Sequence, residues 1–392
     1  MTVAHKMALP TSLLLPNQAS PPLVYRRVVI KAGTNVLANR GHSLDMTVLA
    51  SLADQLVALR GLGAQPLLVS SGAIAAGRES LGKSVDNHTV SGNQLLAAVG
   101  QSRLMHRYEE CFSASGTLVA QALLTRHDLE DRQGYLNVRN TLEGLLDRGV
   151  MPVVNENDVV NAEEISAGFG DNDHLSALVA NLIDADLLLL LTDTAGLFSG
   201  DPKSDHSATL VPEVKVIDEQ VMAMAASHVS KVSRGGMHAK LMAAKLATSF
   251  GVTVVIAGGT ERDVICRAAR GERVGTLFPT TVSRMESRKR WMLSGLAQNR
   301  GTIMVDGGAV SALLDNHTSL LPAGVRQVSG HFERGDFVII HGPSDQQVAC
   351  GIVNYADDEL RVIMGEKSDK ILSKLGHHFG DEVVHRNNMA VL

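Results

Sequence analysis

Polar residues that could bind a charged small molecule follow several short apolar runs, at points where strands would end. Lys31 follows "VVI" and Ser71 follows "QPLLVS", while the stretch from 155 to 173, "NENDVVNAEEISAGFGDND", contains Asp158, Asn172 and Asp173. In a parallel α/β sheet, ligands bind beyond the carboxyl ends of the strands. An ammonium group and several carboxylate or amide oxygens at such an edge could hold a charged substrate.

A second set of residues could bind phosphate. "TDTAGL" begins at Thr192 and Asp193, and "RGGMHAK" runs from Arg234 to Lys240, with two glycines before a helix-like segment. Glycine-rich turns that lead into helices present backbone amides to phosphate, and Lys31 adds a second cation. Each feature alone is most often a solvated strand end, a turn or a soluble loop. Their occurrence at one predicted sheet edge favours phosphoryl transfer from a nucleotide to a small acceptor.

The acidic stretch could bind either a metal ion or an amino group. Mg²⁺ usually binds through one or two carboxylates together with substrate phosphates, so it would arrive with the nucleotide. The calcium-loop pattern DxDxDG is missing. We therefore expect "NEND" and "GDND" to contact a substrate, and the intervening "AEEIS" to be solvated surface or a hairpin.

One motif matches by its letters alone. "GRESLGKS", Gly77 to Ser84, satisfies the P-loop pattern GxxxxGK[ST]. A P-loop requires a strand before it and a helix after it, so that the amides at the helix start cradle phosphate. Here the preceding "SGAIAA" is typical of the first turns of a helix, and a polar loop follows. We interpret the match as a coincidence.

The elements that must position these residues alternate between strands and helices from Val28 to about Phe278. The strand-like runs are "VVIK", "QPLLVS", "TLVAQALL", "VMPVVN", "ADLLLLLT" and "GVTVVIA", and helix-period segments lie between them. The continuous leucine run at 187–191 is typical of a strand that is buried on both faces. This alternation predicts an α/β fold with a mainly parallel open sheet sandwiched by helices.

The alternation of strand-like and helix-like segments ends after Arg273. "SRMESRKRWMLSGLAQNRG" is polar and basic, and the remainder shows short strands separated by glycines, which predicts a small β-rich module with one helix. We expect a disordered extension over 1–26, a catalytic domain over 27–280, a linker over 281–298 and the β-rich domain over 299–392.

Charge and cysteine content exclude several classes of protein. A net charge of -5 and a pI near 6.3 argue against general nucleic-acid binding. The three cysteines lie far apart and form no metal-binding or disulfide pattern, which fits a reducing compartment.

The chain contains no apolar run of the roughly 18 residues that a membrane span needs. The N-terminal stretch faintly resembles a signal or transit peptide, but Pro10 and Pro16 break its apolar patch and no clear cleavage site follows. We expect a cytoplasmic protein.

Seven segments in order carry a resemblance to a known family. "VVIKAGTNVL", "LVSSGAIAAGRESLG", "QLLAAVGQSRL", "VVNENDVV", "GDNDHLSALVA", "LLLLTDTAGL" and "GGMHAKLMAAKLA" closely resemble the glutamate 5-kinase branch of the amino-acid-kinase family. The likeness extends from about Val28 through the C-terminal module, which resembles a PUA domain.

The resemblance implies roles for individual residues. The catalytic positions that it implies are Lys31, Lys240 and Asp173, the last of which would orient the two lysines. The glutamate-binding positions would be Ser71, Asp158 and Asn172. The nucleotide-binding positions would be Lys31, Gly33, Thr192, Asp193, Arg234, Gly235, Gly236, Met237, His238, Ala239 and Lys240.

The resemblance also implies an activity and its partners. The expected reaction is ATP-dependent phosphorylation of the γ-carboxylate of L-glutamate, the first step of proline biosynthesis. Mg²⁺ would arrive with ATP, with no dedicated metal site in the protein. Proline as a feedback inhibitor, a downstream glutamyl-phosphate reductase and a dimer or tetramer are further implications, with no membrane partner.

The chain departs from the family pattern at three positions. Ala32 stands where the family usually has Leu, Asn35 where it has Ser, and Arg234 where Thr is common. We expect activity to survive these changes, with an altered affinity for ATP.

Two other functions are open. One is an amino-acid kinase that acts on aspartate, acetylglutamate or a nucleoside monophosphate, against which the PUA-like tail and the "NEND" and "GDND" pair count. The other is RNA binding through the PUA-like module. From Gln298 onward the chain has eight Lys or Arg against twelve Asp or Glu, the wrong sign for a phosphate-binding surface.

Overall fold

The computed structural model describes residues 22–39, 43–82, 85, 89–160, 171–202, 204–226, 236–280 and 301–392. Most of the expected N-terminal extension, the expected linker 281–298 and the "AEEIS" segment lie outside these residues. The expected domain boundaries stay predictions.

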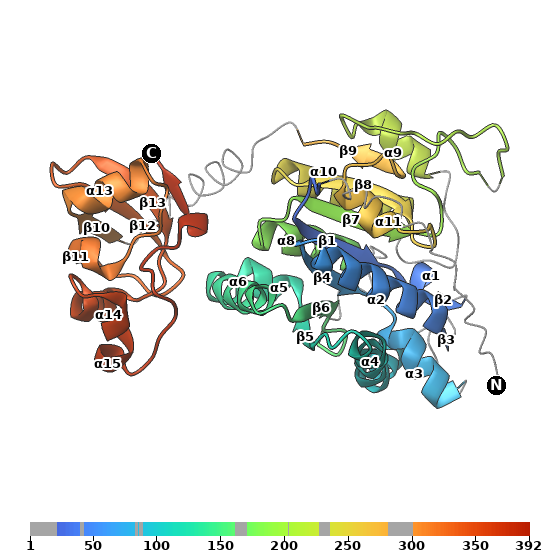
Figure 1. The fold of residues 1–392 in the computed structure, drawn as a ribbon, viewed down its shortest axis with the longest axis horizontal. Coiled ribbons are helices and arrows are strands. Elements are labelled where there is room, and N and C mark those ends of the chain that lie inside the picture. The colour runs from blue at the N-terminus through green and yellow to red at the C-terminus, as the bar shows by residue number, and fades with distance from the viewer. Residues whose placement is uncertain are drawn as a thin grey trace, which may run out of the picture.

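A seven-stranded sheet forms the centre of the larger unit. Its strand order is β5-β6-β4-β1-β7-β8-β9, and Figure 1 shows the strands stacked from β9 at the top to β5 at the bottom. All neighbouring strands are parallel except β8 and β9, which are antiparallel. The strands are β1 (Arg27–Ala32), β4 (Gln65–Ser70), β5 (Val119–Leu124), β6 (Met151–Glu156), β7 (Leu187–Thr192), β8 (Thr253–Gly258) and β9 (Thr276–Phe278).

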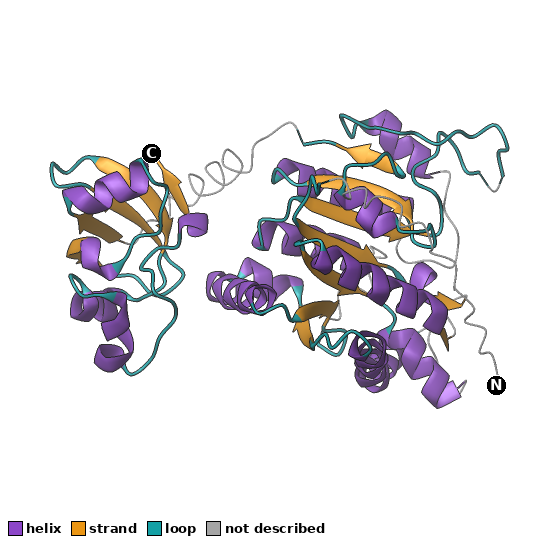
Figure 2. Ribbon diagram, in the orientation of Figure 1, coloured by secondary structure: helices purple, strands orange, loops and turns teal. Residues whose placement is uncertain are grey.

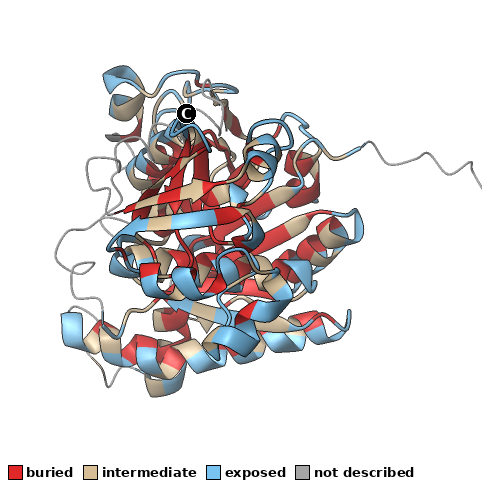
Figure 3. Cartoon of the chain, turned by 90° about the vertical axis from the view of Figure 1, so that its left-hand side faces the viewer, coloured by how far each residue is buried: buried red, intermediate tan, exposed pale blue. Residues whose placement is uncertain are grey.

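Helices cover both faces of this sheet, and the leucine run shows how. Successive side chains of a strand point to opposite faces. In β7, Leu187, Leu189 and Leu191 belong to one apolar core, whereas Leu188 and Leu190 belong to the other. The prediction of a strand buried on both faces is confirmed. Figure 3 shows the buried residues gathered along the strands, with the outer faces of the helices exposed.

The first core packs against α2, α3, α4 and α11, and the second against α6, α8, α9 and α10 (Figure 2). The bounds are α1 (Thr34–Leu37), α2 (Met46–Gly61), α3 (Ala73–Leu81), α4 (Val90–Ser113), α5 (Arg126–Glu130), α6 (Arg132–Asp147), α8 (Asp171–Leu182), α9 (Glu219–Ala226), α10 (Met237–Ser249) and α11 (Val264–Ala269). The short strands β2 (Ala38–Asn39) and β3 (Ser43–Leu44) form a separate pair. Among the described helices, none is both long and apolar enough to cross a membrane.

The P-loop match falls within a helix. Gly77 lies in the middle of α3, and Gly82 follows the end of that helix. The last two residues of the match, at 83 and 84, are not among those described. The prediction that "SGAIAA" begins a helix is confirmed. A P-loop requires a strand directly before its first glycine, whereas Gly77 is preceded by the first turn of α3.

Residues 301–392 form a second, β-rich unit. Its five-stranded sheet has the order β11-β10-β12-β13-β14. The strands are β10 (Gly301–Val305), β11 (Val325–Gly330), β12 (Phe337–His341), β13 (Gln347–Ile352) and β14 (Met389–Val391). The prediction of one helix is wrong, because this unit contains α13 (Gly307–Leu314), α14 (Asp357–Ile363) and α15 (Ile371–Leu375). Two of these span only seven and five residues, too few turns to show a helical period in the sequence.

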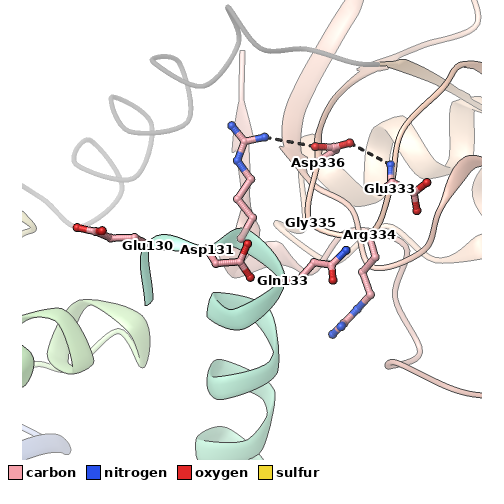
Figure 4. A pocket seen from close by; sticks show the side chains of 8 residues that line it. Glu130, Asp131, Gln133, Glu333, Arg334, Gly335 and Asp336 are labelled. Carbon is pink, nitrogen blue, oxygen red and sulfur yellow. Dashed lines mark hydrogen bonds and ion pairs between the residues drawn. The ribbon is translucent and has the colours of Figure 1, made fainter. Parts of the chain in front are cut away.

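Helix α6 joins the two units. Leu136 is fully buried in a small apolar cluster with Phe337, Cys350 and Ile352 of the second unit. The Arg132 guanidinium lies 4.9 Å from the centre of the Phe337 ring and 3.4 Å from the Asp336 carboxylate. Figure 4 shows the hollow at this contact, with Asp131 and Gln133 on one side and Arg334 and Asp336 on the other.

This contact predicts a measurable loss of stability. Leu136→Ala should lower the free energy of unfolding by about 2–5 kcal/mol, because it leaves a cavity between α6 and the β-rich unit. Chemical and thermal denaturation would measure the change. The matched control is Leu95→Ala on α4, whose side chain is exposed and whose loss should cost under about 0.5 kcal/mol. Equal effects of the two changes would show that Leu136 does not stabilise the contact.

Candidate functional site

Lys31, Asp173 and Lys240 meet at one point although they are far apart in the sequence. The Lys31 ammonium lies 2.8 Å from Asp173 Oδ1, and the Lys240 ammonium lies 3.1 Å from Asp173 Oδ2. Asp173 is completely buried, and each lysine is only 4% exposed. One carboxylate therefore bridges two ammonium groups inside the protein, and we call these three residues the lysine bridge.

The sheet explains this convergence. Lys31 lies near the carboxyl end of the central strand β1, where Ala32 pairs with Ser70 of β4 and with Leu191 of β7. Gly33, Ser71 and Thr192 therefore follow at the same edge of the sheet. Asp173 belongs to the first turn of α8 and Lys240 to the first turn of α10, two helices that contribute to the same apolar core on one face of the sheet.

Glycine at position 33 makes room for the lysine. A Cβ atom at Gly33 would lie 2.9 Å from Lys31 Nζ, which is closer than such contacts normally come. The ammonium group thus lies directly over the turn that starts α1. A side chain at position 33 would displace the flexible end of Lys31.

The lysine bridge carries one net positive charge in a buried position. Burial lowers the pKa of Lys31 from 10.5 to about 8; Asp173 opposes this shift, and Lys240 adds to it. For Asp173, burial alone would raise the pKa of the carboxyl, but Lys240 and Lys31 together hold it below its ordinary value. Asp173 is therefore ionised at neutral pH and is not a proton donor.

Next to the lysine bridge, amide side chains from different elements form hydrogen bonds with one another. Asn172 Nδ2 donates to Ser71 Oγ at 3.0 Å and to Asn155 Oδ1 at 3.1 Å. Asn155 Nδ2 in turn donates to Gln101 Oε1 at 2.7 Å. The structure thus brings the predicted residues Ser71 and Asn172 together, directly beside Asp173. Asp158 lies in the turn after β6 and is partly exposed.

Sequence reasoning missed two members of this amide cluster. Asn155 is the first residue of "NEND" and is 1% exposed at the end of β6. Gln101 lies within "VGQSRL" on α4, more than 50 residues before its partner. The glycine before Gln101 was the available signal, because glycine within a helix marks a close approach of another backbone.

The predicted nucleotide-binding residues lie in two places. Thr192 is buried at the end of β7, and its hydroxyl donates to the Asp193 carboxylate at 3.3 Å. Gly236 is the N-cap residue of α10 and, having no side chain, provides no side-chain cap for this helix. Met237, His238, Ala239 and Lys240 form its first turn. Arg234 and Gly235 lie outside the described residues.

Within the part of the chain that the structure describes, no three His, Cys, Asp or Glu residues gather as a metal-binding group. Asp173, the carboxylate at the centre of the site, is already neutralised by two lysines.

Comparisons with known proteins agree on the type of protein. The profile of the amino acid kinase family matches residues 26–258, and that of the PUA domain matches residues 301–375. A glutamate 5-kinase from Dehalococcoides mccartyi is 49% identical over 94% of this chain and 99% of its own. The glutamate 5-kinase from Shewanella amazonensis is 48% identical over 94% of this chain and 96% of its own. The glutamate 5-kinase from Deinococcus radiodurans is 45% identical over 93% of this chain and 100% of its own.

Among solved structures, the UMP kinase from Bacillus anthracis aligns with a TM-score of 0.43 and 18% identity. The alignment covers 66% of this chain and 97% of that one. This likeness is too slight to support an inference.

The lysine bridge predicts how stability responds to the loss of Asp173. Asp173→Asn should lower the free energy of unfolding by about 3–5 kcal/mol at pH 7, because two buried ammonium groups would then lack their counter-charge. Denaturant unfolding at several pH values would measure it. Asp54→Asn on the exposed face of α2 is the matched control.

The pH dependence has a definite sign. Between about pH 8 and the ordinary lysine value of 10.5, the unfolded chain binds more protons at position 31 than the folded chain does. The contribution of Lys31 to stability therefore rises with pH in this window. In Asp173→Asn, Lys31 loses the carboxylate that raises its pKa and gives up its proton more easily, so the deficit in unfolding free energy should shrink between pH 7 and pH 9. A deficit that is constant with pH would contradict the charge argument.

Proposed function

The chain belongs to the amino acid kinase family, and we propose that it transfers the γ-phosphoryl group of ATP to the γ-carboxylate of L-glutamate. The products are γ-glutamyl phosphate and ADP. The observation that carries the proposal is the lysine bridge, two buried ammonium groups held by Asp173 at the ligand-binding edge of the sheet.

The chemistry needs little from the protein beyond charge and position. A carboxylate oxygen of glutamate forms the new bond to the γ-phosphorus, and the bond from that phosphorus to the β,γ-bridging oxygen breaks, leaving its electron pair on ADP. A glutamate side chain in water ordinarily has a pKa of about 4.3, so the nucleophile is already ionised at neutral pH and requires no general base. Negative charge spreads over the transferring oxygens, and fixed cations stabilise it.

In this scheme the two lysines stabilise the transferring group and Asp173 orients them. Lys31 contacts one carboxylate oxygen of Asp173 and Lys240 contacts the other, so Asp173 holds the two ammonium groups close together. Because Asp173 is ionised, it accepts a hydrogen bond from Lys240, forms an ion pair with Lys31 and takes no part in proton transfer. The net positive charge of the bridge remains available to the phosphoryl group.

The head group of glutamate would bind at the amide cluster. Asn172 Oδ1 is buried and has no hydrogen-bond partner in the described structure, so it can accept from the α-ammonium of the substrate. We assign the same function to the carboxylate of Asp158. Ser71 accepts a hydrogen bond from Asn172 and retains its hydroxyl hydrogen for the substrate.

The nucleotide would bind where α10 begins. Helix α10 begins after Gly236, and the start of a helix suits phosphate because its dipole and backbone amides favour an anion. We therefore assign the Arg234–Lys240 turn, Gly33, Thr192 and Asp193 to ATP. Mg²⁺, held by the nucleotide phosphates, would neutralise part of their charge.

The product constrains the setting of the reaction. An acyl phosphate hydrolyses readily in water, so a reductase that consumes γ-glutamyl phosphate is the expected next enzyme, in proline biosynthesis. Inhibition by proline, a dimeric or tetrameric assembly and a cytoplasmic location belong to the same proposal and stay predictions.

The alternative functions have less support. Three relatives that match more than nine tenths of the chain are named glutamate 5-kinase. The acidic balance of the β-rich unit, eight Lys or Arg against twelve Asp or Glu from Gln298 onward, disfavours RNA binding.

An assay with ATP, Mg²⁺ and hydroxylamine tests the proposed reaction, because hydroxylamine converts the acyl phosphate to a stable hydroxamate. Turnover of glutamate should exceed that of aspartate and N-acetylglutamate on the order of 10²-fold or more in kcat/KM, since aspartate is one methylene short and N-acetylglutamate lacks the ammonium group. A preference for either analogue would overturn the assignment of the substrate.

The division of roles predicts different kinetic defects. Lys31→Ala or Lys240→Ala should lower kcat by about 10²–10³-fold with a small change in the KM for glutamate, because each charge acts mainly in the transition state. Lys245→Ala, an exposed lysine on the same helix as Lys240, is the matched control. Asp158→Asn should instead raise mainly the KM for glutamate, and the reverse pattern would mean that the roles are exchanged.

A further inference from the structure

A continuous chain of hydrogen bonds links Gln101, Asn155, Asn172 and Ser71. The four residues come from α4, β6, α8 and the end of β4, so the chain crosses the ligand-binding edge of the sheet. Its three links are 2.7, 3.1 and 3.0 Å long. Asn155, in the middle, is almost completely buried.

The backbone determines the direction of donation along this chain. The Glu156 amide donates to Asn155 Oδ1 at 2.9 Å, and Asn172 Nδ2 donates to the same oxygen. Asn155 must therefore present its Nδ2 to Gln101, whose Oε1 accepts. A side-chain amide has one oxygen acceptor and one nitrogen donor group, so the orientation of each amide follows from the previous one.

The two outer amides consequently present opposite polarity. Gln101 directs its oxygen to Asn155 and keeps Nε2 as a donor, whereas Asn172 directs its nitrogen inward and keeps Oδ1 as an acceptor. Both of these atoms are buried, and neither has a hydrogen-bond partner among the described residues. Buried polar groups are normally paired, so each calls for an explanation.

Two glycines bring Gln101 to this position. A Cβ atom at Gly100 would lie 1.8 Å from the Ala73 carbonyl oxygen, and one at Gly77 would lie 1.9 Å from the Leu96 carbonyl oxygen. Helices α3 and α4 thus touch backbone to backbone. Because α3 starts just after Ser71, this contact places the residue after Gly100 beside the substrate edge.

We propose that Gln101 is a specificity-determining residue, whose Nε2 donates a hydrogen bond to the α-carboxylate of the amino-acid substrate. The inference rests on the proposed function and deepens it. An α-amino acid carries one group that only donates, its ammonium, and one that only accepts, its carboxylate. Asn172 Oδ1 matches the first group and Gln101 Nε2 the second. The lysine bridge is then available to bind the γ-carboxylate and the transferring phosphoryl group.

A competing interpretation is that Gln101 only holds Asn155 in place. The two interpretations differ in which atom of Gln101 matters. Oε1 alone contacts Asn155, whereas Nε2 alone would contact the substrate. A substitution that preserves the oxygen and removes the donor separates them.

Gln101→Glu is that substitution, because it keeps an acceptor for Asn155 and replaces the donor with a carboxylate oxygen. The KM for glutamate should rise about 10–100-fold, with kcat within about threefold and the KM for ATP unchanged. Isoglutamine, which is glutamate with its α-carboxylate converted to an amide, offers a donor to the new carboxylate. Its kcat/KM relative to that of glutamate should therefore rise by at least about tenfold over wild type.

Two further variants complete the experiment. Gln101→Met removes both polar atoms without adding charge, and should raise the KM for glutamate while reducing the preference of wild type for glutamate over isoglutamine. Gln121→Glu, at an exposed position of β5, is the matched control and should change neither KM. Thermal unfolding of each variant reports whether it folds, and Gln101→Met provides the test if Gln101→Glu does not.

The inference is overturned if Gln101→Glu or Gln101→Met lowers kcat/KM for glutamate and isoglutamine by the same factor, or lowers kcat with the KM for glutamate unchanged. Failure of the proposed function looks different, because the wild-type protein itself would then form no hydroxamate from glutamate.

Discussion

Asp173 is completely buried and contacts the ammonium groups of Lys31 and Lys240, and the arrangement of the site depends on this contact. Removing a lysine from water costs free energy, which is visible in the lowered pKa of Lys31. Two lysines buried side by side would repel each other as well. A single carboxylate between them offsets both penalties and still leaves one positive charge uncompensated.

The fold provides the places that these three residues require. Lys31 lies near the end of the central strand, between β4 and β7, where helices cover the sheet on both faces, and its side chain is almost completely buried. Asp173 and Lys240 come from the first turns of α8 and α10, which pack against each other and share the second apolar core. The charges are therefore held by rigid elements, which suits catalysis by preorganised electrostatics.

Helix α6 connects this core to the β-rich unit. One part of the helix contacts that unit through Arg132 and Leu136. Further along, Arg139 is 1% exposed; its guanidinium donates to the Leu182 carbonyl at the end of α8 and lies 2.6 Å from the Asp184 carboxylate. Helix α8 also carries Asn172 and Asp173. The β-rich unit therefore packs against α6, and α6 is hydrogen-bonded to the helix that carries these two site residues.

Local patterns in the sequence were sufficient to predict the strands of the larger sheet and the candidate residues at the ends of these strands. The leucine run at 187–191 alternates between two cores, as a doubly covered strand must, and the "GRESLGKS" match falls within a helix. Short elements were harder to predict. The seven-residue α14 and five-residue α15 carry too few turns to show a period.

The sequence by itself determined the fold class, the strand-end positions of Lys31, Ser71 and Asp158, and the family, because these depend on local periodicity and on motifs in order. Only the tertiary structure decided that one carboxylate bridges two lysines and that Gln101 and Asn155 extend the cluster around Asn172. Such contacts join residues separated by 17 to more than 100 positions. Their distances follow from strand register and from the approach of helices at Gly77 and Gly100, which no local pattern specifies.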